Sequence, residues 1–270
     1  MQPIQKIGLI AGQGRLPEIL IQRWEAQGFS PVIVGLQGIT PPEILSGRIS
    51  ANFSIGQAGH ILDFFKSQGV ARMVMVGGLK RPNFWTLRTD VVGLGIVLKL
   101  LCRKIGDDTL LRIIRSEIEK RGISVSGAHE FLPELLCPAG VLGSVAPTES
   151  DREIILSGLR AAKAHGAEDK GQSVIVNADG VIGFEDTAGT NALIKSCAGN
   201  QDAILVKVSK PQQDMALDMP TIGLGTIENI YHAGLKGIAV EAGKTIVLDR
   251  DDVIRKCNEY GLFMVGIGEE

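Results

Sequence analysis

Residues 6–28 read KIGLIAGQGRLPEILIQRWEAQG, a short apolar run that ends in glycine and leads into a helical pattern. The run predicts a buried strand, the glycines predict a tight turn, and the later spacing predicts a helix. Two more apolar runs, PVIVGL at 31–36 and RMVMVGG at 72–78, predict strands, with a helix at 61–69 before the second. Because strands that alternate with helices indicate a parallel sheet covered on both faces, we expect a Rossmann-like N-terminal domain.

The second half of the chain alternates in a similar way. A hairpin is predicted around Asp179-Gly180, and Ser150 with Glu153 predicts the capping box of a helix that ends at Gly166. Further strands are expected at 203–208, 237–243, 245–249 and 262–267, and helices near 226–233 and 251–260.

A stretch rich in proline and glycine at 124–147 predicts the junction between two domains. The fold class that follows is α/β, with a Rossmann-like parallel sheet and helices in the first domain and a mixed sheet in the second. The expected organisation is an N-terminal ligand-binding domain at 1–132, a linker at 133–148 and a C-terminal catalytic domain at 149–270.

Composition excludes some partners and compartments. Aromatic residues make up only 4% of the chain, which argues against recognition of nucleic-acid bases by stacking. Four scattered cysteines form no CxxC pair, so we interpret them as reduced packing residues. The opening MQPIQKIGLIAG lacks the basic flank and cleavage site of a secretory signal. A cytoplasmic protein without a nucleic-acid partner is expected, and these patterns leave its oligomeric state open, with a homodimer as one alternative.

The middle of the chain is basic. Residues 66–121 carry twelve Lys and Arg against five Asp and Glu, whereas 122–270 carry twelve against twenty-one. Within the basic part, VVGLGIVLKLLCRK at 91–104 is apolar but shorter than the roughly 20 residues that cross a bilayer. A core helix is one interpretation; a surface for an anionic headgroup or an acylated ligand is the other. The basic residues around it are Lys80, Arg81, Arg88, Lys99, Arg103 and Lys104.

GQGRLP at 12–17 begins like a dinucleotide fingerprint but has Pro17 where that motif has its third glycine. No Asp or Glu directly follows the second strand to hold a ribose, so a nicotinamide cofactor is disfavoured. A phosphate or sugar that approaches the backbone at Gly12 and Gly14 remains an alternative.

Residues 203–226, AILVKVSKPQQDMALDMPTIGLGT, predict a buried strand followed by a polar loop. Its carboxylates could hold a divalent metal or orient water, while its lysines could neutralise a phosphate, a combination that suits phosphoryl transfer; a solvated loop is the alternative. The polar residues concerned are Lys207, Lys210, Gln213, Asp214 and Asp218, with Thr226 as the predicted cap of the next helix.

Two other segments carry polar candidates. FEDTAGTNALIK at 184–195 contributes Thr190 and Asn191, of which Thr190 is either a helix cap or a ligand contact. His129, in SGAHEF, is the one histidine in a conspicuous setting, and it is either structural or a ligand contact. The chain has no GxxxxGK[ST] loop and no GxSxG elbow, so the familiar scaffolds built on those motifs are excluded.

Seven motifs, in order along almost the whole chain, resemble the LpxI family of bacterial UDP-2,3-diacylglucosamine pyrophosphatases. They are GLIAGQGRLP (8–17), GGLKRPNFWTLRTD (77–90), GDDTLLR (106–112), SGAHEFLPELLCPAGVLG (126–143), KGQSVIV (170–176), LVKVSKPQQDMALDMPTIG (205–223) and GLKGIAVEAGKTIVLDR (234–250).

The resemblance implies a Mg²⁺-dependent hydrolysis of UDP-2,3-diacylglucosamine to UMP and 2,3-diacylglucosamine 1-phosphate in lipid A synthesis. It also implies two domains with the ligand between them, and peripheral association with the cytoplasmic face of the inner membrane.

Carried over by position, the resemblance implies that Asp218 is catalytic and a metal ligand, with Asp214 second. It implies that Lys207 and Lys210 lie beside the phosphates. It also implies that Gly77, Gly78, Lys80, Arg81, Gly127, Ala128 and His129 face the nucleotide or sugar. The further substrate-binding positions that we predict are Gly12, Gly14, Gln172, Thr190, Asn191, Gln213 and Thr226.

One segment departs from the family pattern. Where relatives tend to read EGTD, this chain has Ala188-Gly189-Thr190-Asn191, which lacks two acidic groups. A non-catalytic protein that binds a nucleotide sugar or an acylated ligand is therefore the alternative function. A nicotinamide-dependent dehydrogenase is a third, supported by the first strand and turn alone.

Overall fold

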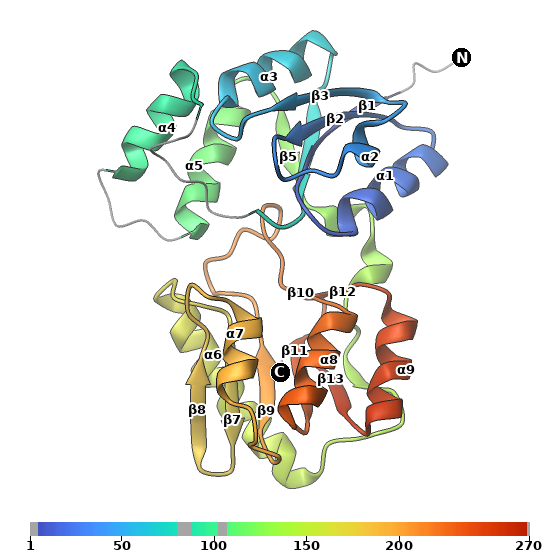
Figure 1. Ribbon diagram of the computed structural model, residues 1–270, viewed down its shortest axis with the longest axis vertical. Helices are drawn as coiled ribbons and strands as arrows, with labels where there is room; N and C mark the ends of the chain where they lie inside the picture. The colour runs from blue at the N-terminus through green and yellow to red at the C-terminus, as the bar shows by residue number, and fades with distance from the viewer. Residues whose placement is uncertain (1–4, 80–87, 102–106, 269–270) are drawn as a thin grey trace. The chain divides into compact units, whose positions relative to one another are not determined.

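The computed structural model describes residues 5–79, 88–101 and 107–268, and the chain divides into two compact units. The N-terminal unit consists of residues 1–133 with 214–218, and the C-terminal unit consists of 134–213 with 219–270. Both units are α/β, which confirms the predicted fold class (Figure 1). The five residues 214–218 therefore belong to a different unit from the chain on either side of them.

The N-terminal unit contains a parallel sheet with strand order β3-β2-β1-β4-β5. From the central strand β1 the chain builds outward through β2 to β3, and then returns to add β4 and β5 on the other side. In such a sheet, ligands bind beyond the carboxyl ends of the strands, where the strand order reverses, here between β1 and β4. The strands are β1 (Lys6–Ala11), β2 (Ser30–Leu36), β3 (Ile49–Phe53), β4 (Arg72–Val76) and β5 (Ser124–Ser126).

Helices cover both faces of this sheet, with α1 and α3 on opposite sides (Figure 1). Apolar residues of α3, α5 and strands β2 and β4 form one buried cluster, which also includes Leu217 from the segment 214–218. That segment is thus part of the core of the N-terminal unit. The helices are α1 (Leu16–Ala26), α2 (Pro42–Leu45), α3 (Ala58–Ser67), α4 (Val91–Leu101) and α5 (Asp107–Glu119), with a 3₁₀ turn η1 (Ala128–Glu130) after β5.

Helix α4 is the apolar stretch singled out from the sequence. Val91 is 89% exposed and Leu94 is 47% exposed, while Ile96 is buried, so the helix is only partly packed in the core. Asp90 attaches its start, because its two carboxylate oxygens accept hydrogen bonds from the amides of His60 and Gly93. No helix in the described part of the chain is both long and apolar enough to span a bilayer.

The C-terminal unit contains a mixed sheet with strand order β6-β13-β11-β9-β7-β8. Strands β9, β11 and β13 are mutually parallel, whereas β6 and β7 run antiparallel to their neighbours. The strands are β6 (Gly140–Leu142), β7 (Ser173–Asn177), β8 (Gly180–Phe184), β9 (Ile204–Lys207), β11 (Gly237–Glu241) and β13 (Phe263–Ile267). Strand β6 lies within the stretch that was predicted as a linker.

Two helical layers enclose the mixed sheet. Ile155 and Ala162 of α6 pack on one face, and residues of α7, α8 and α9 pack on the other. The hairpin at Asp179-Gly180 is confirmed, since it joins β7 to β8 and Gly180 has a φ of 121°. The helices are α6 (Glu149–Ala167), α7 (Thr190–Ser196), α8 (Leu224–Ala233) and α9 (Arg250–Tyr260), and a 3₁₀ turn η2 (Pro133–Leu135) precedes β6.

The predicted capping box of α6 is wrong by two residues. Thr148, not Ser150, caps the helix: its Oγ1 accepts from the Asp151 amide at 3.2 Å, and the Thr148 amide donates to Asp151 at 2.8 Å. Both pairs have suitable spacing, but Asp151 also receives Lys236 Nζ at 2.7 Å in a buried position. The tertiary contact therefore selects the first pair.

The strand predicted at 245–249 is shorter than expected, and it does not belong to the six-stranded mixed sheet. Strand β12 (Ile246–Val247) pairs with β10 (Thr221–Ile222) in a separate two-stranded parallel sheet. This pairing ties the chain that follows residue 218 to the β11–α9 connection.

Candidate active site

Glycines at the ends of β1 and β4 form the switch point of the N-terminal sheet. The Gly12 amide donates to the Val76 carbonyl at 2.7 Å, and Gln13 and Gly78 exchange hydrogen bonds at 2.9 and 2.8 Å. A Cβ on Gly12 would lie 2.7 Å from the carbonyl carbon of Gly77, so the two backbones approach too closely for a side chain. The structure brings Gly12, Gly77 and Gly78 together at the edge where ligands of such sheets bind.

Gly14 differs from Gly12 because its Cβ position is open. Its φ of 98° favours glycine, and no atom of the described residues lies within 4 Å of the position that a Cβ would occupy. Gly78 is equally open. These two positions leave backbone accessible beside the start of α1. Lys80 and Arg81, predicted from the same motif as Gly77 and Gly78, lie outside the described residues.

The turn after β5 contains Gly127, Ala128 and His129. The Gly127 amide donates to Glu130 Oε1 at 2.8 Å, which closes the 3₁₀ turn. A Cβ on Gly127 would meet the His129 ring at 2.3 Å and the Cα of Ala216 at 3.1 Å, so the segment 214–218 passes directly beside this turn. His129 Nδ1 is buried and has no hydrogen-bond partner among the described residues.

The segment 214–218 forms a compact turn organised by Asp214. The Asp214 carbonyl accepts from the amides of Leu217 at 2.9 Å and Asp218 at 3.1 Å. Its carboxylate Oδ1 accepts from the Ala216 amide at 3.1 Å, and its Oδ2 accepts from Arg115 Nη1 at 2.5 Å. Leu217 points into the core, whereas Asp218 is exposed. The turn therefore holds the Asp214 carboxylate in hydrogen bonds and places Asp218 at the surface.

A second set of predicted residues meets at the carboxyl edge of the mixed sheet. Lys207 is the last residue of β9 and pairs with Ser173, the first residue of antiparallel β7. Lys207 Nζ donates to Thr190 Oγ1 at 3.0 Å, and Thr190 Oγ1 donates to Glu185 Oε1 at 3.0 Å. Lys207, Glu185 and Ser173 are all buried. Thr190 thus links a buried ammonium to a buried carboxylate at a strand end.

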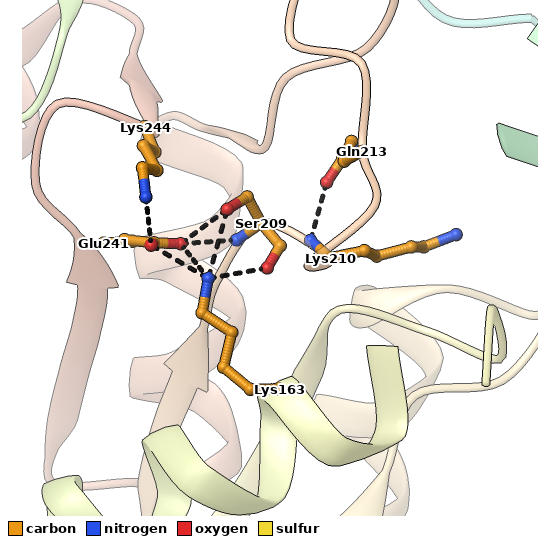
Figure 2. A network of polar contacts seen from close by, with 6 residues as sticks. All are labelled: Lys163, Ser209, Lys210, Gln213, Glu241 and Lys244. Carbon is orange, nitrogen blue, oxygen red and sulfur yellow. Dashed lines mark hydrogen bonds and ion pairs between the residues drawn. The ribbon is translucent and has the colours of Figure 1, made fainter. Parts of the chain in front are cut away.

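Figure 2 shows a network at the same edge that the sequence analysis missed. Lys163 Nζ, from α6, contacts both carboxylate oxygens of Glu241 at 2.8 and 2.7 Å and the Ser209 carbonyl at 2.9 Å. Ser209 donates to Glu241 Oε2 through its amide at 2.9 Å and through its hydroxyl at 2.6 Å. Lys244 Nζ donates to Glu241 Oε1 at 3.1 Å. Glu241 therefore fixes the chain where β9 enters the polar loop.

The charge state of Glu241 follows from this network. Burial by itself would raise its pKa, but the hydrogen bonds from Lys163, Ser209 and Lys244 outweigh burial and lower the pKa to about 2. The carboxylate is thus ionised at neutral pH. One signal in the sequence, a single acidic residue at the end of the apolar strand GIAVE, could have indicated it. Its partner Lys163 lies 78 residues away and gave no such signal.

The loop after Ser209 is attached to the end of α6. Lys210 Nζ reaches Asp169 Oδ1 at 2.5 Å, and Gln212 Nε2 donates to the Gly166 carbonyl at 2.8 Å. The Lys210 amide donates to Gln213 Oε1 at 2.9 Å (Figure 2). Lys210 and Gln213 are therefore brought together, close to α6.

The remaining predicted residues of the C-terminal unit have separate surroundings. Gln172 Oε1 is buried without a hydrogen-bond partner among the described residues, next to Ser173 in sequence. Asn191 Oδ1 accepts from Asn229 Nδ2 at 3.1 Å at the surface. Thr190 and Thr226 are not helix caps, because Gly189 caps α7 and Gly223 caps α8. The cap prediction for Thr226 is wrong, and of the two alternatives for Thr190 the cap is excluded, because both helices start earlier than these hydroxyl side chains suggested.

The 214–218 turn carries two carboxylates, Asp214 and Asp218, which limits the way in which it could bind a magnesium ion. Across residues 5–79, 88–101 and 107–268, no three His, Cys, Asp or Glu side chains gather into a group that could hold a metal. Mg²⁺, however, is often bound by one or two carboxylates together with waters and substrate phosphates. Asp218, which is exposed, would be the residue that holds the ion in that mode.

Comparison with known proteins identifies relatives along the whole chain. Residues 6–135 match the LpxI N-terminal domain, and residues 138–265 match the LpxI C-terminal domain. A relative from Caulobacter vibrioides, named UDP-2,3-diacylglucosamine pyrophosphatase LpxI, is 36% identical over 276 residues, which cover 98% of this chain and 98% of the relative.

Similarity to solved structures is slight. The biotin carboxylase subunit of pyruvate carboxylase is 14% identical with a TM-score of 0.26, over 64% of this chain and 35% of that one. The crystal structure of gox2253 is 11% identical with a TM-score of 0.33, over 98% of this chain and 77% of that one. Similarities at these TM-scores carry no argument about fold or function.

Proposed function

The chain belongs to the LpxI family, and on that premise we propose that it hydrolyses the pyrophosphate bond of UDP-2,3-diacylglucosamine, with Mg²⁺, to UMP and 2,3-diacylglucosamine 1-phosphate. The observation that carries the proposal is the relative of that name, which matches 98% of the chain at 36% identity. A role in lipid A synthesis follows from the same relationship.

Asp218 is proposed as the catalytic carboxylate. It is exposed at the end of the 214–218 turn, so a water or a hydrated cation can reach it. A carboxylate in that position can accept a hydrogen bond from the attacking water and so orient it. Mg²⁺, held by Asp218 together with substrate phosphates, would neutralise negative charge on the phosphate oxygens. Asp214 is the second carboxylate in the proposal.

Binding roles are proposed for the two groups of residues described above. In the C-terminal unit, Lys207 and Lys210 supply positive charge for phosphate oxygens, supported by Gln172, Thr190, Asn191, Gln213 and Thr226. In the N-terminal unit, the open backbone at Gly14 and Gly78 suits a nucleotide or sugar that approaches the chain closely. Gly12, Gly77, Gly127, Ala128, His129, Lys80 and Arg81 complete that proposed set.

A peripheral position on the cytoplasmic face of the inner membrane is proposed from α4. Its exposed Val91 and Leu94 belong to a segment, 66–121, with a net charge of +7. Apolar side chains next to basic ones favour an anionic bilayer surface. Co-sedimentation with anionic vesicles tests this: binding should weaken in high salt and on Leu94→Glu, but not on Leu156→Glu, a matched exposed leucine on α6. Equal binding by the unmutated chain, Leu94→Glu and Leu156→Glu would contradict the proposed membrane position.

The hydrolase proposal is tested with the purified chain, UDP-2,3-diacylglucosamine and Mg²⁺, by quantifying UMP chromatographically. UMP should accumulate, and chelation of the metal should stop its release. Failure of the unmutated protein to release UMP would reject the proposal.

The alternative is a binding protein without turnover. What favours it is the segment 188–191, where Ala188 and Asn191 depart from the acidic pattern that the family resemblance implies, and where Asn191 is hydrogen-bonded to Asn229. Calorimetric titration separates the two functions, because binding of the intact substrate that is unaffected by metal removal, without UMP release, would favour the alternative.

A further inference from the structure

A conspicuous ion pair in the N-terminal unit joins α5 to the 214–218 turn across 99 residues of sequence. Arg115 Nη1 donates to Asp214 Oδ2 at 2.5 Å, and Arg115 Nε donates to Glu119 Oε1 at 2.7 Å. The Arg115 and Asp214 side chains are only 31% and 21% exposed. Glu119 lies one turn further along α5, so it fixes the guanidinium on the helix in the orientation that reaches Asp214.

Asp214 passes this constraint to the backbone of Asp218. Its other carboxylate oxygen accepts from the Ala216 amide, and its carbonyl accepts from the Asp218 amide at 3.1 Å. The side chain that Arg115 holds and the carbonyl that closes the turn belong to the same residue. Movement of Asp214 would therefore displace the amide of Asp218.

Packing restrains the same turn from the inside. Leu217, adjacent to Asp218, is 8% exposed and belongs to the core cluster of α3 and α5. Ala216 lies against Gly127, where even a Cβ would come within 3.1 Å of its Cα. The turn is thus anchored by a salt bridge at its start and by apolar packing in its middle, and Asp218 follows directly.

Electrostatics give the ion pair a second effect. Asp214 and Asp218 are four residues apart in one hydrogen-bonded turn, so this turn carries two acidic side chains. A guanidinium bonded to the first carboxylate compensates its charge and reduces repulsion of the second. Without Arg115, repulsion between the two carboxylates would favour opening of the turn.

From these contacts we infer that Arg115 is a positioning residue for Asp218, acting through Asp214. The inference rests on the proposed function, since Asp218 is the proposed catalytic carboxylate. It assigns Asp214 a role in holding the turn. Arg115 itself does not touch the reacting atoms in this scheme.

Kinetics of Arg115→Ala and Arg115→Lys test the inference, with Arg121→Ala as the matched control. Arg121 follows the same helix, is 29% exposed and pairs with Glu117, not with the 214–218 turn. We expect kcat of Arg115→Ala to fall about 10- to 100-fold with KM little changed, as for loss of a residue that orients a functional group. Arg115→Lys should be intermediate, because an ammonium cannot bond Glu119 and Asp214 in the same fork.

Two further readouts distinguish positioning from a general loss of stability. Added guanidinium should restore part of the kcat of Arg115→Ala but none of that of Asp218→Asn. The double variant Arg115→Ala with Asp214→Asn should be no slower than the slower single variant, because both changes break the same contact. A kcat for Arg115→Ala equal to that of Arg121→Ala would overturn the inference.

Amide hydrogen exchange provides a readout that is independent of turnover. The amides of Leu217 and Asp218 should exchange faster in Arg115→Ala than in Arg121→Ala, because the carbonyl that accepts them is less constrained. Unchanged exchange would overturn the inference even if the chain had no hydrolase activity. Absence of turnover in the unmutated protein would, by contrast, reject only the proposed function.

Discussion

Lys163 Nζ contacts both carboxylate oxygens of Glu241, at 2.8 and 2.7 Å, and so joins α6 to the end of β11. The Glu241 side chain is 7% exposed and that of Lys163 is 29% exposed. Both side chains are hydrogen-bonded to Ser209, where the chain leaves β9 for the loop that leads to Asp218. Stability and the geometry of the loop therefore depend on one carboxylate.

Glu241→Gln should change how stability depends on pH. The pKa of Glu241 is lowered to about 2 in the folded chain, so its contribution is fully present above the unfolded pKa and is lost as pH falls towards 2. A shift of this size corresponds to about 3 kcal/mol. The unmutated chain should lose free energy of unfolding between about pH 5 and pH 2, and Glu241→Gln should show a flatter dependence.

Urea denaturation at a series of pH values measures this difference. At neutral pH, Glu241→Gln should be less stable by about 3–5 kcal/mol, because Lys163 loses its buried partner. Glu259→Gln serves as the control, since Glu259 is 44% exposed and its ion pairs lie at the surface. Parallel pH profiles for the unmutated chain and Glu241→Gln would contradict the assignment.

Gly12→Ala should destabilise the N-terminal unit. The added Cβ would lie 2.7 Å from backbone atoms of Gly77, which cannot move aside as a side chain could. Overpacking of this kind costs about 1–3 kcal/mol. Gly225→Ala in α8 is the matched control, because nothing in the described part of the chain lies within 4 Å of its Cβ position. There alanine should stabilise by about 0.5–1 kcal/mol through helix propensity. Thermal denaturation of both variants compares them, and equal melting temperatures would refute the close approach.

Thr148→Ala should remove the N-cap of α6. Loss of the hydroxyl leaves the Asp151 amide without its cap and should cost about 1 kcal/mol. Ser150→Ala, at the position that the spacing alone favoured, should leave the urea midpoint almost unchanged. The reverse ranking would restore the original capping prediction.

Much of the fold could be predicted because the apolar runs report burial directly. KIGLIAG and PVIVGL form β1 and β2, and the alternation of strands with helices predicts the parallel sheet. The β12 segment was predicted as a strand, but nothing in its residues indicates that its partner is β10. Pairing of that kind depends on where distant segments meet.

The candidate site could be predicted only in part, for the same reason. Polar residues at and after a strand end predicted Lys207, Lys210 and Asp218 as site residues, and these roles stay predictions. Their supports Lys163 and Arg115 sit on helices as ordinary charged residues, and their partners are 78 and 99 residues away. A helix start is also ambiguous where two hydroxyl residues lie close together, as Thr148 and Ser150 do, and where a glycine without a side-chain signal caps the helix, as Gly223 does before Thr226.

Lys207→Met should impair catalysis, and it should also lower stability because the buried Glu185 loses the ammonium that it reaches through Thr190. Methionine keeps most of the volume of this buried side chain but removes the ammonium that contacts Thr190. If that charge neutralises substrate phosphate, kcat/KM for UDP-2,3-diacylglucosamine should fall by about 100-fold or more. Lys195→Met, on the exposed end of α7, is the control and should keep the unmutated value. Equal kcat/KM for the two variants would remove Lys207 from the proposal.

The most direct measurement is the rate of UMP release from saturating UDP-2,3-diacylglucosamine with Mg²⁺, compared between the unmutated chain and Asp218→Asn. Because Asp218 is exposed, replacing its carboxylate with the side-chain amide of asparagine should leave the melting temperature unchanged. We predict steady release by the unmutated chain and a rate about 100- to 1000-fold lower for Asp218→Asn. Equal rates for the two proteins would contradict the role of Asp218.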